Sequence, residues 1–188
     1  MLSALLILVQ PNCAEDPPGF EKIADVSPDG KFGVRISCIG EPEDPNKINP
    51  ALITAVEVVS LPSKDVVVKV GQDYEGNPAH LIWSSDSNWF TYSLADGPRV
   101  TDTHVYHRSG IEFTQLETES LRVNAKGDVR NEYVNPIRWV KPGVLLLEQF
   151  DIFRGGNGED ATYSFTARFD EKTGKSRIIS KKKIPSKE

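Results

Sequence analysis

A pattern that recurs three times constrains the fold of this 188-residue chain more than any other feature. The copies begin at Val26, Trp83 and Trp139; the two tryptophans lie 56 positions apart, and Val26 lies 57 positions before Trp83. Each copy reads as a short extended segment, a tight polar turn and an apolar strand. In the first copy, residues 27–30 are Ser-Pro-Asp-Gly, in which proline presets φ, aspartate bonds back to the backbone and glycine accepts positive φ.

The second half of each copy has the composition of a β-hairpin. In residues 53–70, 104–114 and 163–179, β-branched and aromatic runs are interrupted by turn-forming residues. Each unit is therefore predicted to be a four-stranded antiparallel meander. In the first copy the strands are expected at residues 20–26, 31–38, 52–60 and 65–70, and the three units at residues 20–70, 78–117 and 131–184.

The fold class that follows is all-β, with three blade-like repeats in an open propeller-like array, a sandwich or a half-barrel. Closed propellers have about four to eight blades, so three units leave sheet edges open. Dimerisation to about six blades, or continuation in a longer parent chain, would also cover those edges. Helical periodicity is weak: residues 117–126 fit one short helix, but Leu121 and Val123, two positions apart, fit a strand equally well.

The turn at residues 27–30 and the Trp-Ser-Ser-Asp-Ser-Asn-Trp run at residues 83–89 resemble repeats of TolB-like β-propellers. The resemblance covers most of residues 20–184. Ser87 stands where that family has glycine, and Val140 and Lys141 stand where it has serine and aspartate. The resemblance implies an interaction scaffold or an accessory domain, and it transfers no catalytic residue to this chain.

Charge and length exclude some classes of protein. The chain has the length of one domain, and a formal net charge of -5 lacks the basic excess of a nucleic-acid-binding protein. The charge is uneven: residues 174–188 contain six basic residues and one acid, which leaves the remainder strongly acidic. This basic end is expected to be a solubilising tail, with contact to anionic lipid or to a partner as the alternative.

The first 14 residues have features of a signal peptide. Residues 4–9 are an apolar run too short to cross a bilayer, and Pro11 and Ala14 suit the region before a cleavage site. We therefore expect residues 1–14 to be a leader, residues 15–188 to be a single exported domain, periplasmic or extracellular, and the chain to have no transmembrane span. The alternative is that residues 4–9 form a first strand of the sheet.

Two cysteines are too few for a disulfide scaffold or a cysteine-rich zinc site. Cys13 would be removed with the leader, carry a lipid, or pair with Cys38 if the leader is retained. Cys38 lies in an apolar run, and we predict a buried, unreactive thiol there.

The first candidate binding surface is an acidic rim. The connections between the second and third strands of each unit, residues 40–47, 96–102 and 154–160, should lie on one side of the sheets. They contain three bases and seven acids, the latter being Glu41, Glu43, Asp44, Asp96, Asp102, Glu159 and Asp160. Clustered carboxylates favour a cation or a basic partner, whereas the alternative is a set of solvated loops. Calcium fits this chemistry, but the spacing of an EF-hand loop is absent, and no metal ligand is assigned.

The second candidate is one face of a strand. Alternation places Asp102, His104, Tyr106 and Arg108 on the same side, where an Asp–His pair could act as acid and base or begin a metal site. The alternative is the polar alternation of a half-solvated sheet.

Searches for catalytic motifs find no nucleophile elbow, zinc-binding helix or phosphate-binding glycine loop. We therefore expect an exported, non-catalytic binding or scaffold module without a cofactor, whose acidic rim meets a protein partner or a second copy. An accessory or degenerate domain of a hydrolase is the alternative.

Overall fold

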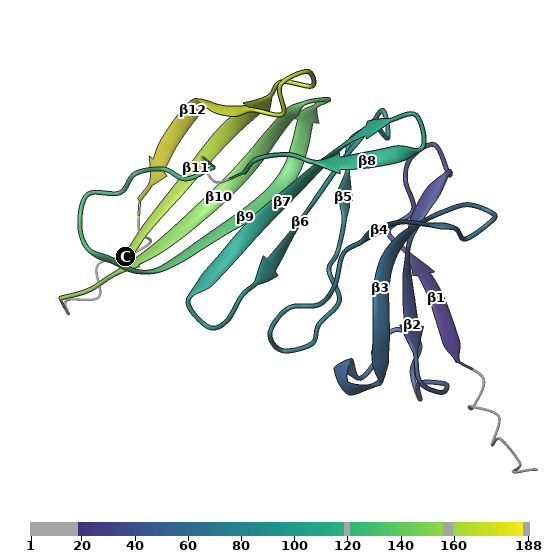
Figure 1. Ribbon diagram of the computed structural model, residues 1–188. Coiled ribbons are helices and arrows are strands. Elements are labelled where there is room, and N and C mark those ends of the chain that lie inside the picture. The colour runs from purple at the N-terminus through teal and green to yellow at the C-terminus, as the bar shows by residue number, and fades with distance from the viewer. Residues whose placement is uncertain (1–18, 119–120, 156–159, 186–188) are drawn as a thin grey trace, which may run out of the picture.

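The computed structural model describes residues 19–118, 121–155 and 160–185, and in this part of the chain it is built of β-strands (Figure 1). The prediction of an all-β fold is confirmed, since the described residues contain no α-helix and a single 3-10 turn at Pro50–Leu52. The described part of residues 117–126 forms neither a helix nor a strand. The predicted leader with Cys13, and Glu159, lie outside the described residues.

No helix in the described ranges is both long and apolar enough to cross a bilayer.

The first sheet pairs its four strands in chain order, each antiparallel to the next. They are β1 (Phe20–Ala24), β2 (Phe32–Cys38), β3 (Ile53–Ser60) and β4 (Val66–Lys69), each within two residues of the predicted bounds. Along β2, alternate residues from Phe32 to Cys38 are buried, as the two-residue period of a half-buried strand requires. Cys38 is a free thiol with 3% of its surface exposed, and burial raises its pKa.

The remaining eight strands form one open sheet. They are β5 (Ile82–Trp83), β6 (Trp89–Ala95), β7 (Val100–Ser109), β8 (Glu112–Gln115), β9 (Val129–Lys141), β10 (Val144–Phe153), β11 (Asp160–Phe169) and β12 (Ser176–Ile184). Strands β5 to β8 pair antiparallel in chain order, as do β9 to β12.

A short parallel pairing of β7 with β9 joins these two groups of strands. It matches Val100 with Glu132 and Thr101 with Tyr133. It forms because β8 pairs only with the C-terminal half of β7, from Tyr106 to Ser109, and leaves the N-terminal half open for β9. The sequence did not predict this junction, because its signal is only two residue pairs long.

The polar turns of the first two copies share the same hydrogen bonds. The hydroxyl of Ser27 donates to Asp29 and accepts from the backbone N–H of Phe32, at 2.7 and 3.0 Å. In the second copy Ser84 donates to Asp86 and accepts from Trp89 in the same way. These closed hydrogen-bond networks explain why a serine and an aspartate recur two positions apart in both turns.

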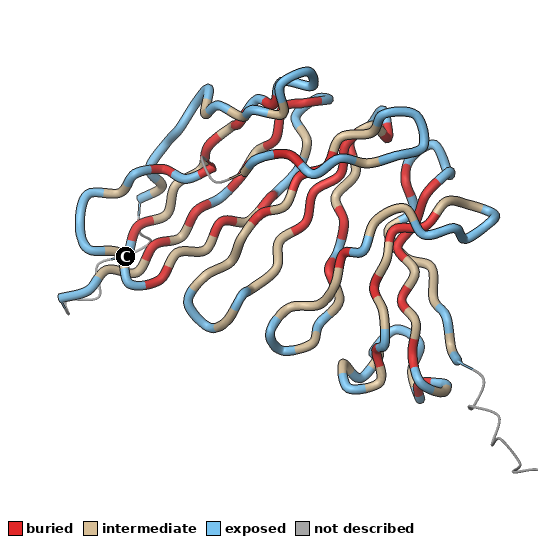
Figure 2. The backbone as a smooth tube through the Cα atoms, in the orientation of Figure 1, coloured by how far each residue is buried: buried red, intermediate tan, exposed pale blue. Residues whose placement is uncertain are grey.

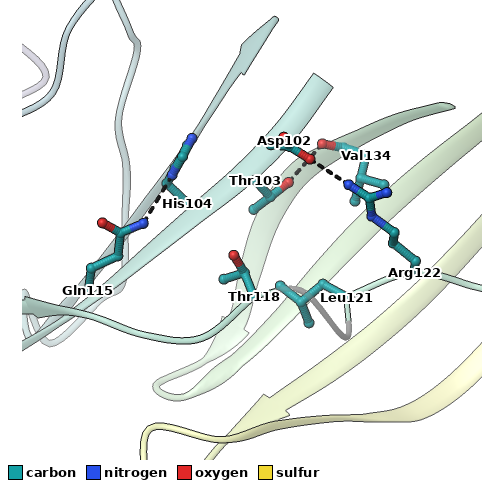
Figure 3. A pocket seen from close by; sticks show the side chains of 8 residues that line it. All are labelled: Asp102, Thr103, His104, Gln115, Thr118, Leu121, Arg122 and Val134. Carbon is teal, nitrogen blue, oxygen red and sulfur yellow. Dashed lines mark hydrogen bonds and ion pairs between the residues drawn. The ribbon is translucent and has the colours of Figure 1, made fainter. Parts of the chain in front are cut away.

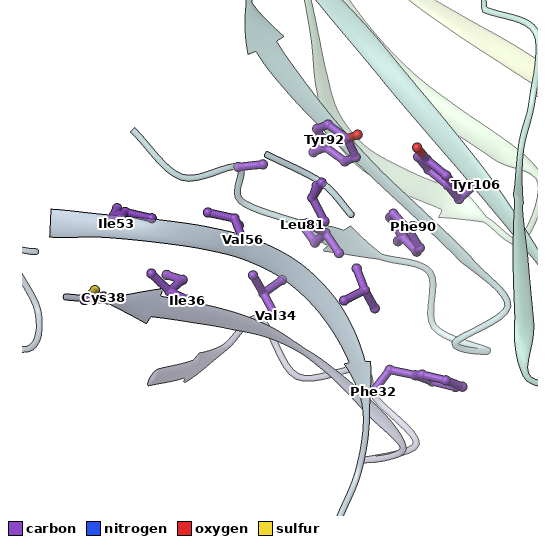
Figure 4. Packing of buried hydrophobic residues seen from close by; sticks show 13 residues of the cluster. Phe32, Val34, Ile36, Cys38, Ile53, Val56, Leu81, Phe90, Tyr92 and Tyr106 are labelled. Carbon is purple, nitrogen blue, oxygen red and sulfur yellow. The ribbon is translucent and has the colours of Figure 1, made fainter. Parts of the chain in front are cut away.

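Two apolar cores hold the sheets. The first core lies between the first sheet and strands β5 to β7, where Val34 and Ile36 pack in one cluster with Leu81, Phe90 and Tyr92 (Figure 4). The second core covers one face of β9 to β11 and includes Trp89 from β6.

The segment that connects β8 to β9 closes the second core. We call residues 121–128 the strap; Figure 1 shows this connection crossing in front of the strands of the large sheet. Leu121 and Val123 of the strap are buried. Figure 2 shows buried segments along the strands of both sheets, whereas most connecting loops are exposed. The backbone N–H of Val123 donates to Gln149 at 2.7 Å, and the Gln149 amide donates to the Val123 carbonyl at 3.0 Å. The Gln149 side chain therefore satisfies both the N–H and the carbonyl of Val123, as the backbone of a neighbouring strand would.

Candidate functional site

Two of the connections predicted to form the acidic rim, residues 40–47 and 96–102, lie along the lower edge of the molecule in Figure 1; of the third, residues 154–160, the structure describes only residues 154, 155 and 160. Glu41, Glu43 and Asp160 are exposed, and Asp44 is half-buried, with a carboxylate oxygen that accepts from the backbone N–H of Asn46 at 2.8 Å. Within the described part of the chain, no three acidic, histidine or cysteine side chains are grouped closely enough to hold a metal ion. These acids are thus spread along the edge.

Two acids of the rim do come together. Asp96 and Asp102 line a recess of about 320 Å³ beside the ends of β6 and β7. Its other lining residues are Gln72, Asp73, Tyr74, Leu94, Ala95 and His104. We call this the acidic recess, because it is lined by three aspartates and, among the described residues, by no lysine or arginine.

A turn between β4 and β5 builds one wall of the acidic recess. The carboxylate of Asp73 accepts from the backbone N–H groups of Glu75 and Asn77, at 2.9 and 2.8 Å. The backbone N–H of Tyr74 donates to the Ala95 carbonyl at 3.0 Å, which attaches the turn to the end of β6. Tyr74 is 53% exposed, so its ring is available at the mouth of the recess.

The electrostatics of the recess favour a cation. Burial opposes ionisation of Asp73, but hydrogen bonds from Asn77, Glu75 and Gly76 outweigh it and hold the pKa of Asp73 below its ordinary value. Asp73 is therefore charged at neutral pH. Sequence reasoning missed Asp73 and Tyr74, although the Asp-Tyr-Glu-Gly-Asn-Pro run at residues 73–78 is a clear turn signal.

A second depression shares Asp102 and His104 with the acidic recess (Figure 3). Its volume is about 190 Å³, and it occupies the fork at which β7 changes its partner from β8 to β9. The lining residues are Asp102, Thr103, His104, Gln115, Thr118, Leu121, Arg122 and Val134. We call this the fork pocket.

His104 is held as a neutral, oriented ring between the two depressions. Its Nδ1 lies 3.2 Å from the Gln115 amide nitrogen, and its ring stacks on Tyr92 with centroids 4.9 Å apart. The Gln115 amide is itself fixed, because Tyr106 donates to its oxygen at 3.0 Å. Burial lowers the pKa of His104, and the charge of Asp102 acts in the opposite direction.

The other members of the predicted strand face have separate partners. Arg108 lies 3.0 Å from Asp29 of the first turn, and its guanidinium sits 5.2 Å above the ring of Phe32. Tyr106 packs in the first core. The contacts of Arg108 join the first sheet to β7, whereas Asp102 and His104 of this face line the two depressions.

Arg122 of the strap bridges the two strands of the parallel junction. Its guanidinium lies 2.7 Å from Asp102 on β7 and 2.6 Å from Glu132 on β9. Asp151 stands directly opposite Glu132 in the sheet and is fully buried. Burial raises the pKa of both Glu132 and Asp151, and Arg122 acts against the rise in each case.

These contacts limit what the fork pocket can do chemically. Two threonines, Thr103 and Thr118, contribute hydroxyl groups to the lining of the pocket. The Thr103 hydroxyl donates a hydrogen bond to the Val134 carbonyl at 2.7 Å. Asp102 is paired with Arg122, and one ring nitrogen of His104 is occupied by Gln115. Among the described residues lining the pocket, no serine or cysteine stands beside His104 as a nucleophile.

No protein-family model matches this sequence, and no curated protein matches it either.

Proposed function

We propose that this protein is a non-catalytic binding module that takes up a basic segment of a protein partner in the acidic recess. The observation that carries the proposal is the lining of that recess: Asp73, Asp96 and Asp102 contribute carboxylates, with no lysine or arginine among the described lining residues. Asp102 is also paired with Arg122 from outside the recess, so the exposed Asp96 is the carboxylate most available to a cation. A lysine or arginine side chain entering it would meet these carboxylates and the exposed ring of Tyr74, which suits a cation–π contact.

The architecture behind this proposal is a stack of three blade-like units in an open propeller-like array. Two equivalent hydrogen bonds support it. The indole N–H of Trp83 donates to the carbonyl of Asp25 at 2.6 Å, and that of Trp139 donates to Ile82 at 2.9 Å. Asp25 and Ile82 each precede the first residue of a copy, so both bonds connect one copy to the next.

A rigid β-scaffold that presents loops at one edge is typical of interaction domains. This is also what the resemblance to TolB-like repeats implies. Export of the protein, with residues 1–14 as leader, belongs to the same proposal and rests on the apolar run at residues 4–9.

The test is a binding measurement with a fluorescently labelled oligolysine peptide at low ionic strength. Wild-type protein should bind it saturably. Asp96→Lys should weaken the affinity about tenfold or more, because it places a positive charge in the recess. Asp96 is exposed, so the fold should tolerate the change.

The matched control is Glu41→Lys, which makes the same charge reversal at an exposed position in the first connection of the rim. It should change the affinity much less than Asp96→Lys. Equal losses in the two variants would mean that net charge, rather than the recess, attracts the peptide, and the proposal would be wrong.

A further inference from the structure

The turn between β11 and β12 lies at the end of the strands opposite to the connections at residues 40–47 and 96–102 (Figure 1). This turn carries a basic recess. Its volume is about 340 Å³. It is lined by Arg168, Phe169, Asp170, Thr173, Lys175, Ser176 and Arg177. Three of these residues are basic and one is acidic, which is the reverse of the balance in the chain as a whole.

Arg168 and Arg177 stand directly opposite each other on neighbouring strands. Both side chains are exposed, and like charges in this position destabilise a sheet. No carboxylate of the described residues lies within ion-pair distance of either arginine or of Lys175. Folding alone therefore gives no reason for this concentration of positive charge.

The carboxylate of Asp170, the single acid in the lining of the recess, forms hydrogen bonds within the turn. Asp170 accepts from the backbone N–H groups of Lys172 and Thr173, at 3.0 and 2.9 Å. These bonds shape the turn and keep the Asp170 carboxylate in place. With Asp170 ionised, the lining of the recess has two positive charges in excess.

We propose that this recess is a binding site for a phosphate monoester group. Arginine presents a planar fork of N–H donors that matches phosphate oxygens, and lysine adds a point charge. A monoester near neutral pH carries about two negative charges, which equals the excess of the lining. Arg168 and Arg177 would bind the oxygens from two strands, and Lys175 would bind from the edge of the turn. The ligand is either a soluble phosphate ester or the headgroup of an anionic lipid.

The site is independent of the proposed function. The acidic recess is built by β6, β7 and the turn at residues 73–78, and it shares no lining residue with the basic recess. Failure of one proposal therefore leaves the other unaffected.

The experiment titrates inorganic phosphate into the ¹⁵N-labelled full chain and follows backbone amide shifts. Saturable shifts are expected in residues 168–177. Arg177→Gln should weaken phosphate binding about tenfold or more, since it removes one of the two guanidinium groups. Lys181→Gln removes the same charge from an exposed position on the same strand, outside the recess, and should leave the affinity within about twofold.

A thermal denaturation series distinguishes loss of binding from loss of folding. Without phosphate, Arg177→Gln should unfold at the wild-type temperature or above it, because the repulsion with Arg168 is gone. Phosphate should raise the wild-type unfolding temperature and not that of Arg177→Gln.

Vesicles identify the source of the phosphate. If vesicles containing phosphatidic acid, but not pure phosphatidylcholine vesicles, displace inorganic phosphate, the ligand is a lipid headgroup; if neither displaces it, the ligand is a soluble ester. Shifts that do not saturate, or equal weakening by Arg177→Gln and Lys181→Gln, would overturn the proposal.

Discussion

The guanidinium of Arg122 lies 2.6 Å from the carboxylate of Glu132 and thereby fixes the strap to the parallel junction of the large sheet. The same guanidinium reaches Asp102 at 2.7 Å, so one side chain spans β7, β9 and the strap. Without it, Glu132 would face the buried carboxyl of Asp151 with no ion-pair partner among the described residues.

Arg122→Gln should therefore destabilise the protein by about 1–3 kcal/mol, measured by urea unfolding. Arg154→Gln is the matched control, because Arg154 lies 3.8 Å from Asp128 and both side chains are exposed. Its cost should be below about 0.5 kcal/mol. Equal effects of the two variants would show that Arg122 does not hold the junction.

Because of Asp151, the free energy of unfolding should fall as the pH rises above about 4. Burial raises its pKa in the folded state, so in the pH range between the unfolded value, about 4, and the raised value the folded state binds more protons. The contribution of Asp151 to stability is therefore full below that range and is lost as pH rises through it.

Asp151→Asn cannot ionise and should remove this loss. Its free energy of unfolding should exceed that of wild type at neutral pH, and the advantage should shrink as pH falls towards about 4. Glu148→Gln, at an exposed carboxylate of the same strand, is the control and should give a constant offset. Parallel curves for Asp151→Asn and wild type would contradict the assignment.

The indole hydrogen bonds of Trp83 and Trp139 should contribute similarly to the free energy of unfolding. Trp83→Phe and Trp139→Phe each remove an indole N–H that donates to a backbone carbonyl of the preceding copy. Each should cost about 1–3 kcal/mol in urea unfolding, from the lost bond and the lost ring volume. If one of the two variants unfolded at the wild-type urea concentration, the two contacts would not be equivalent.

The pKa of His104 should respond to Asp102. The negative charge of Asp102 stabilises the protonated ring against the effect of burial, so Asp102→Asn should lower the pKa of His104 further. Titration of the His104 ring protons by NMR measures this directly. Asp44→Asn, on a different connection of the rim, should leave the titration unchanged, and a rise in Asp102→Asn would contradict the electrostatic account.

Local chemistry explains what was predictable from the sequence. The strands of the first sheet follow from β-branched runs, and the turns at residues 27–30 and 84–88 follow from serine and aspartate, whose side chains bond within the turn. The eight-stranded sheet depends on a junction of two residue pairs between segments about 30 positions apart. Such a contact leaves no local pattern to recognise.

The candidate site was predictable in part. The sequence places Asp96 and Asp102 in a connection of the predicted rim, and Asp102 and His104 on one face of a predicted strand. All three residues line the acidic recess. Asp73 and Tyr74 complete it from another connection, which the predicted rim did not include. Arg122 was missed because its partners come from two strands that the sequence did not place side by side.

The most direct test of the central claim is to map where a basic peptide touches the protein. Oligolysine peptide added to the ¹⁵N-labelled full chain should shift the backbone amides of residues 73–75, 94–96 and 102–104, and Asp96→Lys should reduce these shifts. Shifts confined to residues 40–47, or scattered over the surface without saturation, would contradict binding in the acidic recess.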